Sequence, residues 1–512
     1  MARSSERRWV PAFAGTTELC KLSWSSVVLN NTTDVSTRRV PSSGSGGLVR
    51  RRAVLAATIL GSSLAFTDAA VVNIALPALQ SAFNASAAIV QWVMNAYLLM
   101  LGALVLVGGA AADRYGRKRI FVLGVVVFAA ASLACAVGPT VWLLVVARGL
   151  QGLGAALLTP ASLALLGANF TEAERPRVFG IWAGAGALTT ALGPVLGGWL
   201  VDTIGWRTIF LINLPVAALT VFIALRSVPE SRDDNARALD IPGTLAAISG
   251  LGALTYGLTV ASGNGWTGAT RAWIIAGGVL LAGFLVLERH SRAPMMPLEL
   301  FRSRSFASLN AMTFLLYFAL SGTLFLLPFE LIRLEGYSAT AAGAALLPFA
   351  LVMGLFSSSA GRMATRIGTR LQLSVGPLVA GAGIAWLGLA GIDAGYWTAR
   401  LPPLLVLAVG MTLTVGPLTA AVMSAVDARH TGVASGINNA VARIGGMMAV
   451  ASLTLVVAIV ASAESGPARD VLAAVDRDGF HRGFRAAMMA AGACAALGGL
   501  LIAIMLTPVR NR

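Results

Sequence analysis

Charged residues are scarce in this sequence. Only 12% of its 512 residues are Asp, Glu, Lys or Arg, and 57% are hydrophobic, whereas a soluble domain carries about 25% charged residues. A fold of this length could not solvate its surface with so few ionic groups, so the composition excludes a water-soluble enzyme. It predicts a single polytopic membrane domain whose main partner is the lipid bilayer.

Lysine, cysteine and histidine are also rare. Neither Lys21 nor Lys118 follows a glycine, which excludes a Gly-Lys-Ser/Thr phosphate loop, so ATP-driven pumping would need another subunit. The three cysteines lie too far apart for a C-x-x-C metal pair or a disulfide framework: Cys20, Cys135 and Cys494. The three histidines are expected in polar connectors, which disfavours a metal site: His290, His430 and His481.

Long apolar stretches are abundant, and fourteen of them reach the roughly 20 residues that a bilayer span requires. They predict an all-α integral membrane protein with fourteen transmembrane helices. Their centres lie near Leu64, Leu101, Phe128, Ala155, Leu188, Val216, Gly250, Gly278, Tyr317, Ala350, Ala380, Leu413, Val450 and Gly498.

The basic residues predict the orientation of these spans. Of the 38 Lys and Arg residues, 22 lie in connectors on the side of Arg50 and eight lie in connectors on the other side. Cytoplasmic loops carry the excess of basic residues, so we expect both termini in the cytoplasm. The net charge of +16 therefore indicates orientation, and no nucleic-acid partner is expected.

Residues 1–49 differ from the rest because they are polar and rich in Ser and Arg. They lack the apolar core of a cleavable signal peptide. We expect a disordered cytoplasmic tail. The alternative is that translation starts later, near Leu48 or Val49.

One acidic residue, Asp68, is expected deep within a span. A charge at the centre of a bilayer costs on the order of 2.5–3.5 kcal/mol, so such residues are functional candidates. A carboxyl group there can alternate between a neutral form and a charged form that needs a cation, which predicts proton or cation coupling. The alternative is a structural Asp satisfied by neighbouring hydroxyls and amides. Glu330 is expected at the outer end of the ninth span, within reach of water.

Arg148 is the corresponding buried cation, in the fourth span. Arginine does not lose its proton in practice, so it needs an electron-rich partner. Gln151 and Gly152 share its helical face. We expect Arg148 to be a fixed charge that tunes a nearby carboxylate, although a purely structural role stays open. Arg443 is expected near a cytoplasmic boundary, where its side chain would reach the interface.

The connector after the second span reads Gly109-Ala-Ala-Ala-Asp-Arg-Tyr-Gly-Arg-Lys-Arg119. Asp113 can pair with an arginine and accept backbone donors from the next helix, which predicts a latch that stabilises one conformation. A weaker copy, Gly361 to Arg370, occurs at a similar place in the second half. This repetition indicates a duplicated architecture.

The fifth span is rich in glycine, which allows close helix contact, and it contains a proline, which bends a helix. Gly180, Gly184 and Gly186 are followed by Gly193-Pro-Val-Leu-Gly-Gly198.

Together these segments resemble the major facilitator superfamily, and within it the fourteen-span drug:proton antiporters of the EmrB/QacA type. The loop signature Gly-x-x-x-Asp-Arg-x-Gly-Arg-Lys is matched by Gly109, Asp113, Arg114, Gly116, Arg117 and Lys118. Fourth-span Arg-x-x-Gln-Gly is matched by Arg148, Gln151 and Gly152. The fifth-span antiporter signature is matched by Gly180, Gly193, Pro194, Gly197 and Gly198, with Thr189 in place of one glycine. The first-span pattern of this branch runs from Asp68 to Pro77.

The resemblance implies a fold and roles for these residues. It implies the major facilitator fold: two six-helix bundles over 50–227 and 305–512, with two extra helices in a linker over 228–304. Asp68 and Arg148 would couple protons, Asp113 and its basic neighbours would form the conformational latch, and the fifth span would seal against leak. Apart from the resemblance, polar residues within the spans are candidates to line a substrate cavity, with an interfacial position as the alternative for a tyrosine near a span end: Asn95, Gln151, Asn310 and Tyr317.

The expected function is export of drugs or other small amphipathic compounds across the bacterial inner membrane, in exchange for protons. One proton crossing 100 mV releases about 2.3 kcal/mol, which is enough energy to drive the export of a solute. We therefore expect the proton-motive force as the energy source and no cofactor. A proton-coupled nutrient importer and a non-transporting membrane sensor are the alternatives. The chain would act as a monomer or with a periplasmic adaptor.

Overall fold

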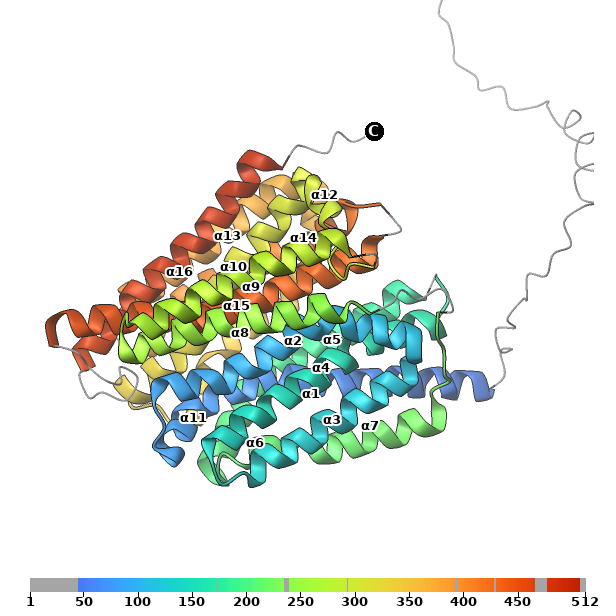
Figure 1. The fold of residues 1–512 in the computed structure, drawn as a ribbon, viewed down its shortest axis with the longest axis horizontal. Coiled ribbons are helices and arrows are strands. Elements are labelled where there is room, and N and C mark those ends of the chain that lie inside the picture. Colours follow the sequence, from blue (N-terminus) through green and yellow to red (C-terminus); the bar gives the residue numbers. More distant parts are fainter. Residues whose placement is uncertain are drawn as a thin grey trace, which may run out of the picture. The chain divides into compact units, whose positions relative to one another are not determined.

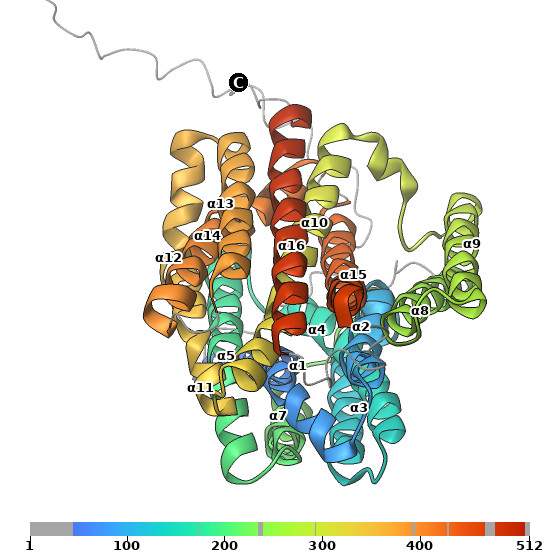
Figure 2. The same ribbon diagram turned by 90° about the vertical axis from the view of Figure 1, so that its left-hand side faces the viewer.

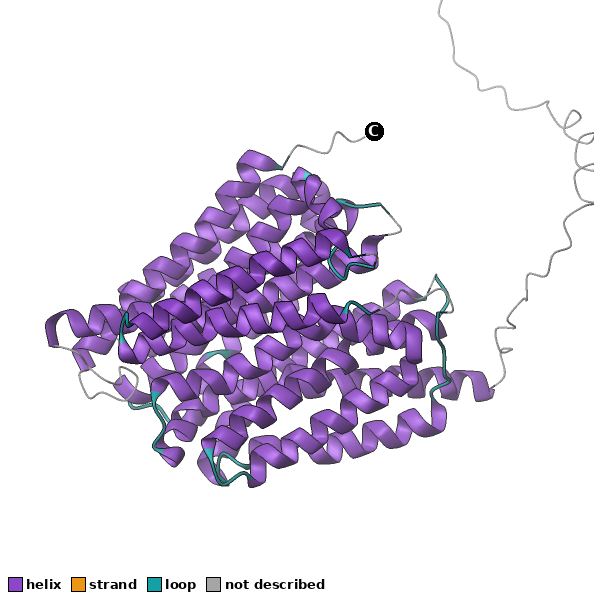
Figure 3. Ribbon diagram, viewed as in Figure 1, coloured by secondary structure: helices purple, strands orange, loops and turns teal. Residues whose placement is uncertain are grey.

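The structure is a computed structural model that describes residues 45–172, 174–233, 239–291, 293–391, 395–427, 430–465 and 477–506. Most of the predicted tail therefore lies outside the described residues. Within those ranges every regular element is helical, as Figure 3 shows. Among the described residues, fourteen helices are long and apolar enough to cross a membrane, and each predicted centre lies within one of them, which confirms the predicted count.

The helices follow one another along the chain with short connections (Figure 1). Several spans are interrupted by a short helix or a π-helical turn (η2 and η3). The elements are α1 (Ser45–Phe83), α2 (Ala87–Tyr115), α3 (Arg117–Val137), α4 (Val141–Asn169), α5 (Arg175–Thr203), α6 (Thr208–Leu211), α7 (Asn213–Ser227), α8 (Ile241–Asn264), α9 (Gly268–His290), η1 (Leu298–Arg302), α10 (Arg304–Phe329), η2 (Glu330–Leu334), α11 (Ala339–Ala345), α12 (Leu347–Ile367), α13 (Thr369–Leu389), η3 (Tyr396–Arg400), α14 (Leu401–Ser424), α15 (Thr431–Ser465) and α16 (Arg477–Met505).

Polar residues begin several of these helices. The hydroxyl oxygens of Ser86 and Thr140 accept hydrogen bonds from the third backbone N–H that follows, at 3.4 and 3.3 Å. Asp240 does the same for α8, at 2.9 Å. Such caps satisfy backbone donors that a helix leaves free at its first turn. The apolar stretches and the caps between them thus determine where the spans start.

The two halves of the chain repeat one packing pattern. In the first half α4 packs on α2 and α3, and α3 packs on α7. In the second half α14 packs on α12 and α13, and α13 packs on α16. The described helices are therefore arranged as a duplicated bundle, as the repeated loop sequence predicts.

The two inserted helices, α8 and α9, come from the middle of the sequence and pack beside the two halves of the bundle. α8 packs on α2 from the first half and on α15 from the second, and α9 packs on α8. Figure 2 shows α8 and α9 side by side next to α15 and α2. Aromatic contacts support this position, since the ring of Tyr256 lies 6.1 Å from Trp92 and 5.1 Å from Trp273.

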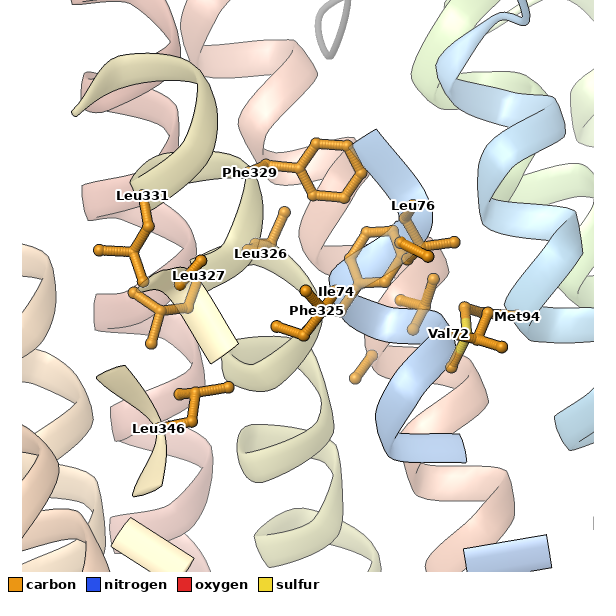
Figure 4. Close-up of a cluster of buried hydrophobic side chains, with 14 of the residues drawn as sticks. Val72, Ile74, Leu76, Met94, Phe325, Leu326, Leu327, Phe329, Leu331 and Leu346 are labelled. Carbon is orange, nitrogen blue, oxygen red and sulfur yellow. The ribbon is translucent and has the colours of Figure 1, made fainter. Parts of the chain in front are cut away.

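The two halves meet firmly at the end of the bundle where α5 reaches Asp202, which we call the Asp202 end. There α1 and α10 share one buried apolar cluster, and Figure 4 draws Ile74 and Phe325 next to each other within it. The Asp202 carboxylate also accepts the backbone N–H groups of Ala339 and Thr340 of α11, at 3.2 and 2.7 Å. The halves are therefore in close contact at this end.

Candidate functional site

Asp68 of α1 and Arg148 of α4 form an ion pair inside the first half of the chain. Arg148 Nη1 donates to Asp68 Oδ2, and both side chains are completely buried. The sequence predicts these two residues as functional charges, and the structure brings them into direct contact. A buried pair of this kind is costly to break, because removing one partner leaves the other charge uncompensated.

Gln151 connects this pair to α3. Its Nε2 donates to Asp68 Oδ1 at 3.2 Å and to Ser132 Oγ at 2.7 Å, and its Oε1 accepts from Arg148 Nη1 at 2.8 Å. Asn213 of α7 donates to the same Ser132 hydroxyl at 3.3 Å. The predicted cavity residue Gln151 is therefore part of the Asp68 site. Ser132 was not identified from the sequence, because a single serine in an apolar helix gives no distinctive signal.

Arg148 has two further contacts, both with α2. Its Nε donates to the Val93 carbonyl at 3.0 Å, and its guanidinium carbon lies 4.4 Å from the centre of the Tyr97 ring. This cation–π contact is favourable where water is excluded. The helices can approach this closely because Gly152 faces α2: a Cβ atom there would lie 3.0 Å from Met100 Cβ and would overlap the Tyr97 carbonyl.

Loop 109–119 forms the Asp113–Arg117 pair that its sequence indicates, with Nε and Nη2 donating to Asp113 Oδ1 at 2.9 and 2.8 Å. The expected helix-terminal role of Asp113 is wrong, however. The backbone N–H groups of Lys118 and Arg119 donate to Glu230, at 3.0 and 3.1 Å. Glu230 lies more than a hundred residues further along the chain, so local sequence could not indicate it.

Other members of this loop have different surroundings. Gly116 has φ +113°, a conformation that favours glycine, and a Cβ there would lie 2.8 Å from the Glu230 carboxyl carbon. Lys118 Nζ donates to the Leu225 carbonyl at 2.9 Å. Arg114 is exposed and lies over its neighbour Tyr115, and Gly109 is in ordinary contact with Pro160.

The corresponding turn of the second half has the same backbone form. Gly368 lies between α12 and α13 as Gly116 lies between α2 and α3, and its φ is +89°. Arg370 donates to the Ala503 carbonyl of α16 at 2.5 Å. The loop copy noticed in the sequence thus occupies the matching structural position.

The glycine-rich part of α5 divides into a packed half and an open half. Cβ atoms at Gly193 and Gly197 would lie 2.7 and 2.8 Å from Ala70 Cβ and Val71 Cγ1 of α1. Gly198 faces α11, where a Cβ would lie 2.5 Å from the Ala339 carbonyl carbon. The carbonyl of Pro194 contacts Gly343 of α11 in the same way. At the opposite end, a Cβ at Gly180 would have no neighbour within 4 Å, so the close contact expected there is absent.

The remaining predicted cavity residues lie in different surroundings. Asn95 of α2 is fully buried, and neither atom of its amide has a hydrogen-bond partner in the described chain. Asn310 of α10 is also buried and accepts from Asn438 of α15 at 3.2 Å. Tyr317 is half-buried on α10.

The expected boundary position of Arg443 is wrong. It is the thirteenth residue of α15, and a Cβ atom at Gly102, halfway along α2, would lie 3.2 Å from Arg443 Cβ. Arg443 therefore lies where the two halves meet, well inside the span.

The expected water access of Glu330 is also wrong. Its side chain is fully buried at the Asp202 end and accepts from Arg400 Nη2 at 3.3 Å. Arg400 also pairs with Glu335, and His481 Nδ1 lies 2.8 Å from Glu330 Oε1. We call these four residues the Arg400 cluster. Burial raises the pKa of Glu335. His481 belongs to α16, not to a connector, and His290 is the last residue of α9.

The described ranges hold no candidate metal site. There, no group of three or more His, Cys, Asp or Glu side chains is placed to hold an ion. Among the described residues, two groups of buried charges are ion-paired, the Asp68 site in the first half and the Arg400 cluster in the second, and Asp240 and Glu288 are buried acidic residues outside both groups. We take the Asp68 site as the candidate functional site. It combines a carboxylate, a cation, and hydroxyl and amide partners within the membrane-spanning helices.

Comparisons with known proteins agree with this arrangement. Residues 58–450 match the family model of the Major Facilitator Superfamily. The chain is 38% identical over 420 residues to the multidrug resistance protein Stp of Mycobacterium tuberculosis, a match covering 81% of this chain and 77% of the relative. It is 35% identical to the methylenomycin A resistance protein of Bacillus subtilis, with 81% and 89% covered. It is 32% identical to the tetracenomycin C resistance and export protein of Streptomyces glaucescens, with 82% and 78% covered.

Solved structures share the fold at low sequence identity. A bacterial homologue of the human lysosomal transporter Spinster matches with a TM-score of 0.63 and 17% identity, covering 89% of this chain and 97% of that one. The xylose transporter XylE of E. coli matches with a TM-score of 0.60 and 16% identity, covering 90% and 98%. These two structures support the architecture alone.

Proposed function

Because this chain belongs to the Major Facilitator Superfamily, we propose that it exports drugs or similar small amphipathic molecules in exchange for protons. It is a multi-pass membrane protein of a transporter family. Its relatives carry names of multidrug resistance, antibiotic resistance and antibiotic export. These names support a drug as substrate, and a proton gradient supplies enough energy to move one.

The observation that carries the proposal is the buried ion pair of Asp68 and Arg148, with Gln151 as their shared partner. The carboxylate of Asp68 that Arg148 contacts is also the group that would accept a proton. Protonating it removes the charge–charge attraction, so proton binding and the ion pair compete. The competition gives two states of the site that a proton can select between.

The rest of the fold supports alternating access. The halves touch closely at the Asp202 end, while Gly180 of α5 and Gly354 of α12 face open space toward the other end. A transporter must close one end before it opens the other. In the proposed cycle loop 109–119 is the latch, and the packed half of α5 seals the Asp202 end.

We place the protein in the bacterial inner membrane with both termini in the cytoplasm, because basic residues are in excess in the loops on the side of Arg50. In this orientation the Asp202 end would face outward, and the close contact of the two halves there would close the outer side. Export would use the proton-motive force without a cofactor. The protein would work as a monomer or with a periplasmic adaptor.

The test is drug-dependent proton movement in proteoliposomes. Asp68→Asn keeps the size of the side chain but cannot bind and release a proton, and it retains one of the two acceptor oxygens that Arg148 and Gln151 contact. We expect it to remain folded and to lose drug transport driven by a pH gradient. The matched control is Glu172→Gln, since the side chain of Glu172 is 93% exposed, and it should transport normally.

The outcome that contradicts the assignment is full coupled transport by Asp68→Asn. The same assay decides direction, because an antiporter and a nutrient importer move their substrate in opposite directions relative to the proton. If the drug moves in the same direction as the proton, the result favours the importer.

A further inference from the structure

Arg443 is a third arginine at the depth of the membrane-spanning helices. It belongs neither to the Asp68 site nor to the Arg400 cluster. It is the thirteenth residue of α15, so about 18 Å of helix precede it at 1.5 Å per residue. It faces Gly102 of α2, where a Cβ atom would be 3.2 Å from Arg443 Cβ. This position lies within the roughly 30 Å hydrocarbon thickness of a bilayer, at the seam between the halves.

The charge of Arg443 is unpaired in the part of the chain that the structure describes. There it has no hydrogen bond and no carboxylate within 4.0 Å, unlike Arg148 and Arg400, which are both paired. Its side chain is only half-buried. An arginine at this depth is costly unless it finds an anionic partner, and its partial exposure leaves the guanidinium accessible.

Aromatic and apolar groups surround this cation. Tyr97 and Tyr317 both lie close enough for electrostatic interaction with Arg443, and they come from α2 and α10 respectively. Met447 and Met448 of α15 and the partly buried Phe314 of α10 belong to the apolar cluster that includes Tyr97. A free cation beside aromatic rings matches a molecule that combines an aromatic body with one negative group.

The site adjoins the proposed proton site. Tyr97, which Arg443 acts on, is the same side chain whose ring lies 4.4 Å from the Arg148 guanidinium. An anion held by Arg443 would therefore sit next to the residue that pairs with Asp68. Its charge would be felt by the Asp68 pair, because interactions are strong where water is excluded.

We infer that Arg443 binds the carboxylate or sulfonate of an aromatic monoanion, and that such anions are among the molecules this protein moves. This inference rests on the proposed function and adds a substrate class to it. The planar guanidinium can hold a carboxylate or sulfonate through two parallel hydrogen bonds. Tyr317, which is partly exposed, then contacts the ring system, whereas Tyr97 is fully buried behind it.

The experiment uses two probes that share a skeleton. 8-Anilinonaphthalene-1-sulfonate carries a permanent negative charge, and N-phenyl-1-naphthylamine is the same framework without the sulfonate. Uptake of both radiolabelled probes is measured in proteoliposomes with an imposed proton gradient, and uptake by protein-free liposomes is subtracted. The wild type is compared with Arg443→Gln, Arg443→Lys and the control Arg271→Gln, which changes an exposed arginine.

The wild type should transport both probes. Arg443→Gln should raise the KM for the sulfonate at least tenfold and leave the KM for the neutral probe within twofold. Arg443→Lys should lie between, because lysine keeps the charge but loses the two-point geometry. Arg271→Gln should match the wild type.

Each other result overturns the inference. If Arg443→Gln weakens transport of both probes equally, Arg443 has a structural or coupling role; if it changes neither, the anion does not contact it. A wild type that moves the neutral probe but not the sulfonate removes the inference and leaves the proposed function standing. A wild type that moves neither probe also overturns the inference, and drug-dependent proton movement then decides the proposed function separately.

Discussion

A side chain at Gly198 should shift the protein toward conformations that are open at the Asp202 end. In the structure this glycine lets α5 lie directly against the first turn of α11. A Cβ atom there would be 2.5 Å from the Ala339 carbonyl carbon and 2.7 Å from Thr340 Cα. Both neighbours are backbone atoms, so they cannot rotate away as a side chain could.

The size of the shift follows from this overlap. Carbon atoms that are not bonded approach to about 3.5 Å, so Gly198→Ala requires the two backbones to separate by roughly 1 Å. Overpacking of this kind costs about 1–3 kcal/mol. If the cost falls only on the form closed at the Asp202 end, the ratio of closed to open molecules falls about 5- to 150-fold.

The assay is a distance measurement between spin labels at the Asp202 end. Ile204→Cys and Trp397→Cys give one label in each half, at side chains that are 64% and 76% exposed, on a chain whose native cysteines are replaced by alanine. Pulsed electron resonance reports the populations of short and long distances. Gly198→Ala should raise the long-distance population.

Two control variants separate this effect from general damage. Gly180→Ala lies on the same helix where a Cβ has no neighbour within 4 Å, and it should leave the distances unchanged. Gly154→Ala would clash within the first half, 2.7 Å from the Phe128 nitrogen, so it should lower stability without shifting the distances. If Gly198→Ala behaves like either control, the α5–α11 contact does not determine which end is closed.

Two other predictions concern the buried and exposed charges. Arg400→Leu leaves the two carboxylates of the Arg400 cluster without their cation, which should cost about 3–5 kcal/mol; thermal unfolding in detergent should show a much lower Tm than for Arg271→Leu, and equal Tm values would contradict the role of the cluster. The backbone N–H of Thr171 donates to Glu174 and lowers the pKa of that carboxyl group. The stability from this bond is therefore present above the unfolded pKa of about 4.3 and lost as pH falls through the lower folded value. Hydrogen exchange at the Thr171 amide, corrected for its intrinsic rate, should accelerate in that acidic window in the wild type but show no such step in Glu174→Gln.

Much of the fold was predictable because each span satisfies its own backbone hydrogen bonds. In a bilayer an apolar stretch of sufficient length must form a helix, so hydropathy alone indicated all fourteen spans. The cost of a charge in lipid likewise indicated that Asp68 and Arg148 are functional candidates and that Arg148 needs an electron-rich partner. The Asp113–Arg117 pair followed from a single acidic residue among several basic ones in the connector, although Gly116 ends the helix between the two residues.

Other parts of the sites depend on segments that are distant in the chain. Glu230 accepts backbone donors from Lys118 and Arg119 across more than a hundred residues. The Arg400 cluster joins three helical segments through side chains that each looked like ordinary loop or boundary residues. Hydropathy averages over a window, so it cannot tell which of two neighbouring turns ends in water.

The sequence by itself therefore determined the number of spans, their helical state and the presence of two costly charges, because these follow from transferring each segment separately into lipid. Only the tertiary structure decided the depth of Arg443, the burial of Glu330 and the choice of Glu230 as a helix cap. Depth and partner depend on how far each helix extends and which face it turns to its neighbours. Those are properties of the packed bundle, where backbone approach at glycines such as Gly152 and Gly198 sets which side chains meet.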